Sequence, residues 1–238
     1  LILYFKGFDE EIGDKVDFPA AYDYSKKDTT KEKSEWRNLL GEIFKQTTDH
    51  SLKEFVELPA KSLDEGNVLR TLNEKLDKQI IQTWENLRKE GLDTPSKRAS
   101  NLKLNINHYV NSDKSHEFHL GIIDTSADEG GKGFTIKDRS VGLNWFFNFI
   151  VKLNYNPHYR GEKPEEAIYL LDEPGSNLHS SAQEGLLKIL KKFSERNSII
   201  YGTHSENLLN PELINVNAIK IVEKDSKVQV KSFPEAGI

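Results

Sequence analysis

The sequence predicts an α/β fold, with parallel strands and flanking helices that follow a mainly helical region. Residues 167–172 and 198–203 contain two short apolar runs with the length and aliphatic content of strands from the interior of a sheet. A helix is expected between them, from about Leu178 to Arg196. Strand, helix and strand in this order form a right-handed crossover unit, which joins two parallel strands.

The first apolar run ends in two adjacent carboxylates, Asp172 and Glu173. Open α/β sheets bind their ligands at the carboxyl ends of the strands, so both side chains are expected at a ligand site. Asp172 suits a Mg²⁺ ion, held directly or through water, and Glu173 suits the activation of an attacking water. His204 follows the second strand, where its imidazole is expected to meet a γ-phosphate. The pattern predicts a nucleotide-hydrolysis site; the alternative is a structural acidic pair at a strand end.

The chain after Glu173 predicts a sharp turn into the helix. Pro174-Gly175 redirects the backbone, and the side chains of Ser176 and Asn177 can accept hydrogen bonds from the first free N–H groups of a helix. We therefore expect these two residues to supply the N-cap.

A second segment with anion-binding character lies upstream, at residues 137–145, with the sequence KDRSVGLNW. Ser140 is expected to cap the helix that follows, so that its hydroxyl and the first free N–H groups point at an anion. That helix is apolar at Trp145, Phe146, Phe149, Ile150 and Leu153.

Taken in chain order, these segments resemble the motifs of ABC-type ATPases. LLDEP at 170–174 resembles the Walker B motif, SNLH at 176–179 the D-loop, and THS at 203–205 the segment of the switch histidine. DRSVGLNW at 138–145 is similar to the signature of the overcoming-lysogenization-defect (OLD) group and departs from the LSGGQ of transporters. The resemblance covers residues 117–232 and is to the soluble branch that includes the SMC, RecF and OLD families.

The resemblance implies the carboxyl-terminal lobe of an ABC-type P-loop ATPase, which binds ATP and Mg²⁺. It also implies a homodimer that holds ATP between its subunits, and a role in DNA maintenance or anti-phage defence with DNA and a nuclease domain or partner. The residue roles that it implies are catalysis by Glu173 and His204, metal binding by Asp172, and nucleotide binding by Arg139, Ser140, Gly142 and Asn177.

No stretch of the sequence supplies the G-x-x-x-x-G-K-[ST] of a P-loop. Gly130-Gly131-Lys132-Gly133 lacks the upstream glycine and the final hydroxyl, and is expected to be a hairpin turn between Ile122 and Phe134. We expect this chain to be the carboxyl-terminal part of a longer ATPase, and to bind ATP weakly or not at all by itself. The alternative function is a non-catalytic interaction module that keeps the ABC-like fold and binds a protein partner through its helical region.

The composition limits the partners. The 238 residues are 36% hydrophobic and 30% charged, with a net charge of −5, so DNA would have to meet a local basic patch or the assembled dimer. Cysteine is absent, which excludes disulfides and thiol chemistry and fits a cytoplasmic location. No apolar run reaches transmembrane length, so no membrane partner is expected.

Residues 1–100 are predicted to be a mainly helical insertion or arm, and residues 101–238 the ATPase lobe. Residues 1–5 suit a strand, and residues 9–33 are polar enough to suggest an irregular exposed segment. Helices are expected around residues 36–44, 52–56 and 68–90, where apolar residues recur every three or four positions.

The helix over residues 68–90 allows two interpretations. It is either the base of a coiled-coil arm or a helix packed on the core, and three heptads are short for a coiled coil, which favours the packed helix.

Downstream of this helix, alternating apolar residues predict an antiparallel hairpin over residues 102–106 and 118–122. His116 and His119 are three residues apart on its second strand. They are therefore expected on opposite faces, where they form no metal pair.

Overall fold

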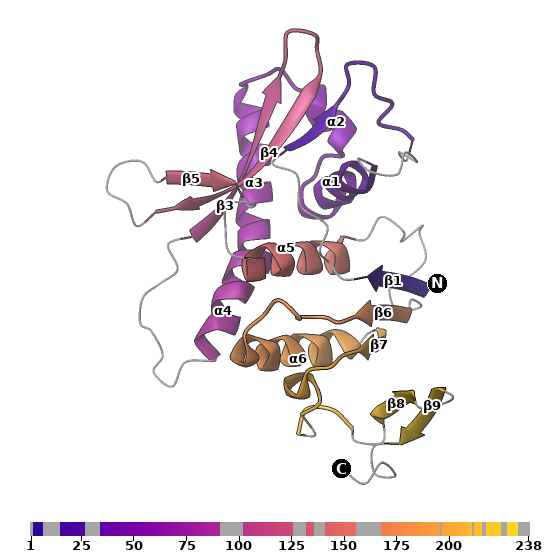
Figure 1. The fold of residues 1–238 in the computed structure, drawn as a ribbon. Coiled ribbons are helices and arrows are strands. Elements are labelled where there is room, and N and C mark those ends of the chain that lie inside the picture. Colours follow the sequence, from indigo (N-terminus) through magenta and orange to yellow (C-terminus); the bar gives the residue numbers. More distant parts are fainter. Residues whose placement is uncertain are drawn as a thin grey trace. The chain divides into compact units, whose positions relative to one another are not determined.

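A computed structural model describes residues 2–6, 15–26, 34–90, 102–125, 132–135, 141–155, 168–195, 197–210, 212–215, 218–224 and 228–232 (Figure 1). The chain divides into two compact units. The crossover unit contains segments from residues 1–7, 87–95 and 163–238, and the hairpin unit contains segments from residues 8–86 and 96–162. This division differs from the predicted boundary between residues 100 and 101, because the first strand pairs with a strand from the last third of the chain.

The crossover unit contains a parallel sheet with β6 in the middle (Figure 1). In spatial order its strands are β1 (Ile2–Lys6), β6 (Ile168–Asp172) and β7 (Ser198–Gly202). The predicted parallel pair of β6 and β7 is confirmed, and so is the strand expected at residues 1–5. Lys6, Asp172 and Gly202 stand side by side in the register, so all three strands end at the same edge of the sheet.

Helix α6 (Ser180–Ser194) connects β6 to β7, as predicted. It packs on the sheet through an apolar stripe, and the ring of Phe193 meets Tyr169 of β6 edge to face at 4.9 Å. The buried apolar residues of the stripe are Ala182, Leu186, Leu187 and Leu190.

The start of α6 differs from the prediction. Its N-cap is His179, which makes no side-chain capping hydrogen bond, whereas Ser176 and Asn177 lie in the preceding turn. The reason is a pair of turn hydrogen bonds, from Ser176 N–H to the Glu173 carbonyl (3.3 Å) and from Leu178 N–H to the Gly175 carbonyl (2.9 Å). These bonds continue the turn through Leu178, which is buried, before the helix begins.

Later in the crossover unit, the short 3₁₀ helix η3 (Glu206–Leu208) follows β7. Two more strands, β8 (Lys220–Lys224) and β9 (Val228–Ser232), form an antiparallel pair of their own.

The hairpin unit has an antiparallel sheet centred on β4 (His116–Asp124). On one side β3 (Leu102–Val110) pairs with the full length of β4, which confirms the predicted hairpin. On the other side β2 (Lys15–Phe18) pairs with the first half of β4 and β5 (Lys132–Thr135) with the second half. Phe134 stands opposite Ile122, as the predicted glycine-rich turn requires. However, Lys132 and Gly133 belong to β5 itself, and the turn lies outside the described residues.

Strand β2 corrects the expectation that residues 9–33 form an irregular exposed segment. Val16 and Phe18 are buried, and the ring of Phe18 contacts those of Tyr24 and Phe118 at 5.5 and 5.8 Å. A segment of four residues is too short to show the alternation of a strand among polar neighbours. The strand forms because it pairs with β4, and this pairing cannot be read from the sequence of β2 itself.

Helices α1 (Ser34–Thr47), α2 (Leu52–Val56) and α3 (Leu63–Leu76) bring apolar residues to one face of this sheet. The helices expected over residues 36–44 and 52–56 are confirmed. Phe44 of α1 and Phe55 of α2 pack against each other at 4.8 Å and both contact Phe118 of β4. These three rings form an aromatic cluster within the core of the hairpin unit.

The long predicted helix is present and begins earlier than expected, because Ser62 caps α3 by accepting a hydrogen bond from Glu65 N–H. It continues through a π-helical turn, η1 (Asp77–Ile81), into α4 (Gln82–Glu90). Its side chains bond to the backbone of β3: Asn73 exchanges two hydrogen bonds with Ile106, at 2.7 and 3.1 Å, and Asp77 accepts one from Leu104 N–H at 3.0 Å. These contacts support the interpretation as a packed helix.

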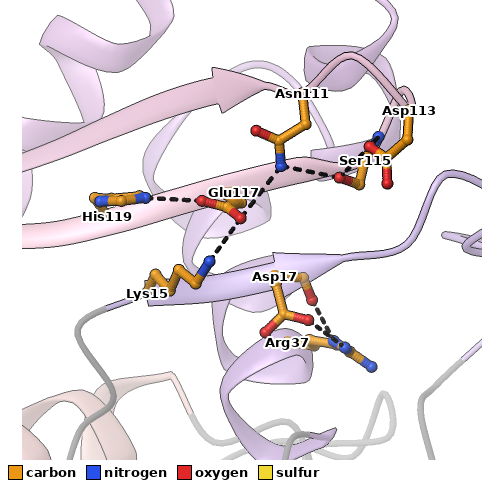
Figure 2. A network of polar contacts seen from close by, with 8 residues as sticks. All are labelled: Lys15, Asp17, Arg37, Asn111, Asp113, Ser115, Glu117 and His119. Carbon is orange, nitrogen blue, oxygen red and sulfur yellow. Dashed lines mark hydrogen bonds and ion pairs between the residues drawn. The ribbon is translucent and has the colours of Figure 1, made fainter.

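The opposite face of the sheet is polar (Figure 2). Glu117 of β4 accepts hydrogen bonds from Lys15 Nζ (2.6 Å) and Asn111 Nδ2 (3.2 Å), and its second oxygen lies 3.0 Å from His119 Nε2. His116 lies on the apolar face, where its ring stacks on His108. The prediction that the two histidines occupy opposite faces is confirmed.

Helix α5 (Val141–Asn154) is the predicted helix of the signature-like segment. Every residue from 145 to 153 is buried. Within the hairpin unit Phe146 contacts Trp84 of α4, and Lys152 pairs with Glu35 of α1 at 3.2 Å.

Among the described residues, no helix combines the length and the apolar composition needed to cross a membrane.

Candidate nucleotide-hydrolysis site

The first acidic residue of the site, Asp172, is the last residue of the central strand β6. Its side chain is half-buried, and its Oδ2 accepts a hydrogen bond from the hydroxyl of Tyr4 on β1 at 3.2 Å. Desolvation, followed by the hydrogen bond and the negative charge of Asp172, raises the pKa of Tyr4 above its ordinary value. Tyr4 therefore stays a neutral donor that can orient the carboxylate.

Glu173 is the first residue beyond β6 and has a left-handed backbone conformation, with φ at +48°. Such a value is uncommon for a residue other than glycine. Residues with this backbone conformation are found more often at active sites and ligand-binding sites, where the surrounding structure holds the backbone in place. Here the N–H of Glu173 donates to the carbonyl of Gly202 at the end of β7 at 2.9 Å. This bond holds the backbone of Glu173 at the turn after the strand, and thereby holds the Cα from which the glutamate side chain extends.

His204 meets Glu173 across the edge of the sheet. The backbone N–H of His204 donates to Glu173 Oε2 at 3.3 Å, and its imidazole Nε2 lies 3.5 Å from Glu173 Oε1. The imidazole is 99% exposed, whereas the glutamate side chain is 35% exposed. The pair thus combines a partly exposed carboxylate with a ring that is open to a ligand.

This arrangement suits a metal-nucleotide more than a metal ion alone. Among the described residues, no group of three or more His, Cys, Asp or Glu side chains could enclose a metal. Mg²⁺, however, commonly binds through one or two carboxylates together with substrate phosphates and water. Asp172, a single carboxylate at the strand end, fits that manner of binding.

The residues predicted to bind nucleotide lie in different places. Asn177 is exposed in the turn between β6 and α6 of the crossover unit, close in sequence to the acidic pair. Gly142 is the second residue of α5 in the hairpin unit. Arg139 and Ser140 lie outside the described residues.

Two residues of the site escaped prediction. Tyr4 reaches Asp172 only because β1 pairs with β6, and that pairing joins segments more than 160 residues apart. Gln183 is a buried polar residue beside the apolar stripe of α6. The available signal was a polar residue next to the apolar positions of the helix, because buried polar side chains are almost always hydrogen-bonded.

Comparison with known proteins gives a family match and a distant relative. A family described as the AAA ATPase domain matches residues 12–209. An uncharacterized protein of Methanocaldococcus jannaschii is 27% identical over 93 residues, which cover 39% of this chain. The match spans 24% of that relative, so the chain corresponds to about a quarter of its length.

Solved structures of SMC ATPases are similar at low identity. An SMC ATPase studied for ATP-driven dimerization and DNA-stimulated activation is 15% identical, with a TM-score of 0.40 over 71% of this chain and 92% of that chain. The Smc head domain of Pyrococcus yayanosii, with a coiled coil and joint, is 19% identical, with a TM-score of 0.42 over 73% of this chain and 30% of that chain. The Smc head domain of Pyrococcus furiosus, bound to the C-terminal domain of ScpA, is 16% identical, with a TM-score of 0.37 over 73% of this chain and 40% of that chain.

Proposed function

We propose, because this chain belongs to the family of AAA ATPase domains, that its acidic pair and His204 form the water-activating half of an ATP-hydrolysis site. The observation that carries the proposal is the contact of Glu173 with His204 beside Asp172, where three parallel strands end. A structural acidic pair would not require a left-handed glutamate or an open imidazole next to it.

In the proposed mechanism Glu173 accepts a proton from the attacking water while the oxygen of that water forms a bond to the γ-phosphorus of ATP. The bond between that phosphorus and the β–γ bridging oxygen breaks, and the products are ADP and inorganic phosphate. Asp172 would hold Mg²⁺, which supplies charge neutralisation at the phosphates. No covalent intermediate with the protein is needed, so the protein contributes positioning and electrostatic stabilisation.

His204 is proposed to sense the γ-phosphate. Its backbone is held by the hydrogen bond to Glu173, while its exposed ring is free to meet an anion. A ligand that draws the imidazole toward phosphate would also change the contact with Glu173, because the two side chains lie within 3.5 Å. Binding and water activation would thereby be linked at one pair of residues.

The remaining residue roles concern a second subunit. We propose that Arg139, Ser140 and Gly142, together with Asn177, meet ATP held by the partner in a homodimer. The support is the resemblance of the DRSVG segment to the ABC signature and the position of Gly142 in the first turn of α5, because the N-terminal end of a helix carries partial positive charge that favours an anion.

The test is Glu173→Gln in the protein as its gene encodes it, because glutamine keeps the shape but removes the base. We expect kcat for ATP hydrolysis to fall by at least about a hundredfold. The variant should still bind ATP, and light scattering should show that its ATP-bound dimer accumulates. The matched control is Glu184→Gln on the exposed face of α6, which should keep the wild-type rate. Hydrolysis by the Glu173 variant at the wild-type rate would exclude the assignment of Glu173, whereas a wild-type protein that hydrolyses no ATP would favour the non-catalytic interaction module.

For the biological setting we propose DNA maintenance or anti-phage defence in the cytoplasm, with a nuclease domain or partner. The support is the resemblance of the signature-like segment to the OLD group. ATP hydrolysis that is unaffected by double-stranded or single-stranded DNA at low salt would argue against DNA as a partner.

A further inference from the structure

Gln183 joins the two loops that carry the reacting groups. Its side-chain Nε2 donates to the carbonyl of Gly175, two residues after Glu173, at 2.9 Å. Its Oε1 accepts from Ser205 Oγ at 2.6 Å and from Asn207 Nδ2 at 3.1 Å, just beyond His204. One buried amide on α6 therefore bridges the turn after β6 and the loop after β7.

Both bridged segments are otherwise closely constrained. Gly175 has φ at +80°, and a Cβ placed there would lie 2.6 Å from Leu186 of α6. In the other loop, Ser205 N–H donates to Thr203 Oγ1 at 3.0 Å, and the hydroxyl of Tyr201 donates to the carbonyl of buried Leu208 at 2.5 Å. The bridge thus connects two preshaped loops and sets their separation.

We propose that Gln183 is a positioning residue for ATP hydrolysis, which holds Glu173 and His204 in register by bridging their loops. This inference rests on the proposed function. The amide suits the task because it offers a donor to a carbonyl and an acceptor with two lone pairs to two donors. A glutamate at this position would place a carboxylate oxygen against the Gly175 carbonyl, and a methionine would keep the volume without the hydrogen bonds.

The first test measures kinetics in the protein as its gene encodes it. We expect Gln183→Met to lower kcat at least about tenfold with a KM for ATP changed less than about threefold. Ser205→Ala, which removes one of the three bonds, should have a smaller effect in the same direction. The packing control is Leu187→Met, a buried neighbour on α6 whose substitution should leave kcat within about threefold even where Tm falls.

A double-mutant cycle separates positioning from general stability. If Gln183 acts through Glu173, then Gln183→Met should change the residual rate of the Glu173→Gln variant less than about twofold. Full additivity of the two effects would overturn the inference.

Amide hydrogen exchange gives a readout that does not depend on turnover. Gln183→Met should speed exchange in residues 173–178 and 203–208, whereas Leu187→Met should not. If the wild-type protein hydrolyses ATP but the Gln183 variant keeps both its rate and its exchange pattern, the inference fails and the proposed function stands. If the wild-type protein does not hydrolyse ATP, the proposed function fails, and with it the role of Gln183 in hydrolysis. If the Gln183→Met variant then also shows the wild-type exchange pattern, Gln183 does not hold the two loops together either.

Discussion

At the scale of single residues, Gly175 stands out among the described glycines because it alone combines a positive φ with a neighbouring side chain where a Cβ would lie. A side chain there would face both a left-handed φ of +80° and a 2.6 Å approach to buried Leu186. We expect Gly175→Ala to lower the free energy of unfolding by about 1–3 kcal/mol, as measured by urea unfolding.

The matched control is Gly66→Ala, because Gly66 lies inside α3 with open space around it. Alanine at this helical position should raise the free energy of unfolding by about 0.5–1 kcal/mol. A Gly175 variant as stable as the Gly66 variant would contradict the turn described here.

The acidic pair and His204 could be located from sequence because each follows an apolar run directly, and the ends of adjacent parallel strands meet. Tyr4 and Gln183 could not be located in this way. Their contacts depend on which distant strand pairs with β6 and on how α6 faces the two loops, and local spacing contains neither fact.

At the scale of elements, an ion pair on the polar face of the sheet joins β2 to β4, between Lys15 and Glu117. The hydrogen bond from Lys15, followed by those with His119 and Asn111, lowers the pKa of Glu117 from 4.5 to about 2. A carboxyl whose pKa is lower in the folded state stabilises the fold above its unfolded pKa. We therefore expect stability to fall as the pH decreases from about 4.5 toward 2.

The measurement is urea unfolding across this pH range for wild type and Glu117→Gln. The variant should be less stable at neutral pH and should show a weaker acid dependence, because glutamine does not titrate. Glu74→Gln, an exposed change on α3, should keep the wild-type acid dependence. Identical pH profiles for wild type and the Glu117 variant would contradict this role.

Elements with a clear period could be predicted from sequence. The helices α1 and α2 and the β3–β4 hairpin have such a period, and β6 and β7 are short apolar runs, so the types of these elements were foreseen. Strand β2 has too few residues for a period and is stabilised by β4, and α6 begins late because turn hydrogen bonds outcompete two good capping side chains. The formation of β2 and the start of α6 thus depend on long-range pairing and on turn geometry, which the local sequence pattern does not show.

At the scale of the whole molecule, the missing P-loop sequence predicts weak nucleotide binding by these 238 residues. Because no P-loop sequence is present to hold the β-phosphate, we expect the 238 residues alone to show no micromolar ATP binding in isothermal titration calorimetry. Micromolar binding would show that another segment replaces the P-loop.

The proposed dimer makes a separate prediction for Gly142→Asp. A carboxylate in the first turn of α5 should repel the partner's ATP and abolish ATP-driven dimerisation, while the affinity of each subunit for its own nucleotide is retained. Mixing this variant with one defective in its own ATP binding should restore partial hydrolysis, because one of the two mixed sites is intact. Normal hydrolysis by the Gly142 variant alone would show that this segment only begins a helix.

The hydrogen bonds of Asn73 and Asp77 with β3 also affect self-association. Among the described strands β3 pairs with β4 alone, and the outer edge of a strand is a template on which other chains can add strands. Asn73 offers Ile106 a donor and an acceptor, as a residue of a neighbouring strand would, and Asp77 occupies the N–H of Leu104. The long helix thereby occupies backbone groups of β3 that an added strand would need, so we expect the side chains that anchor this helix also to hinder aggregation through this edge.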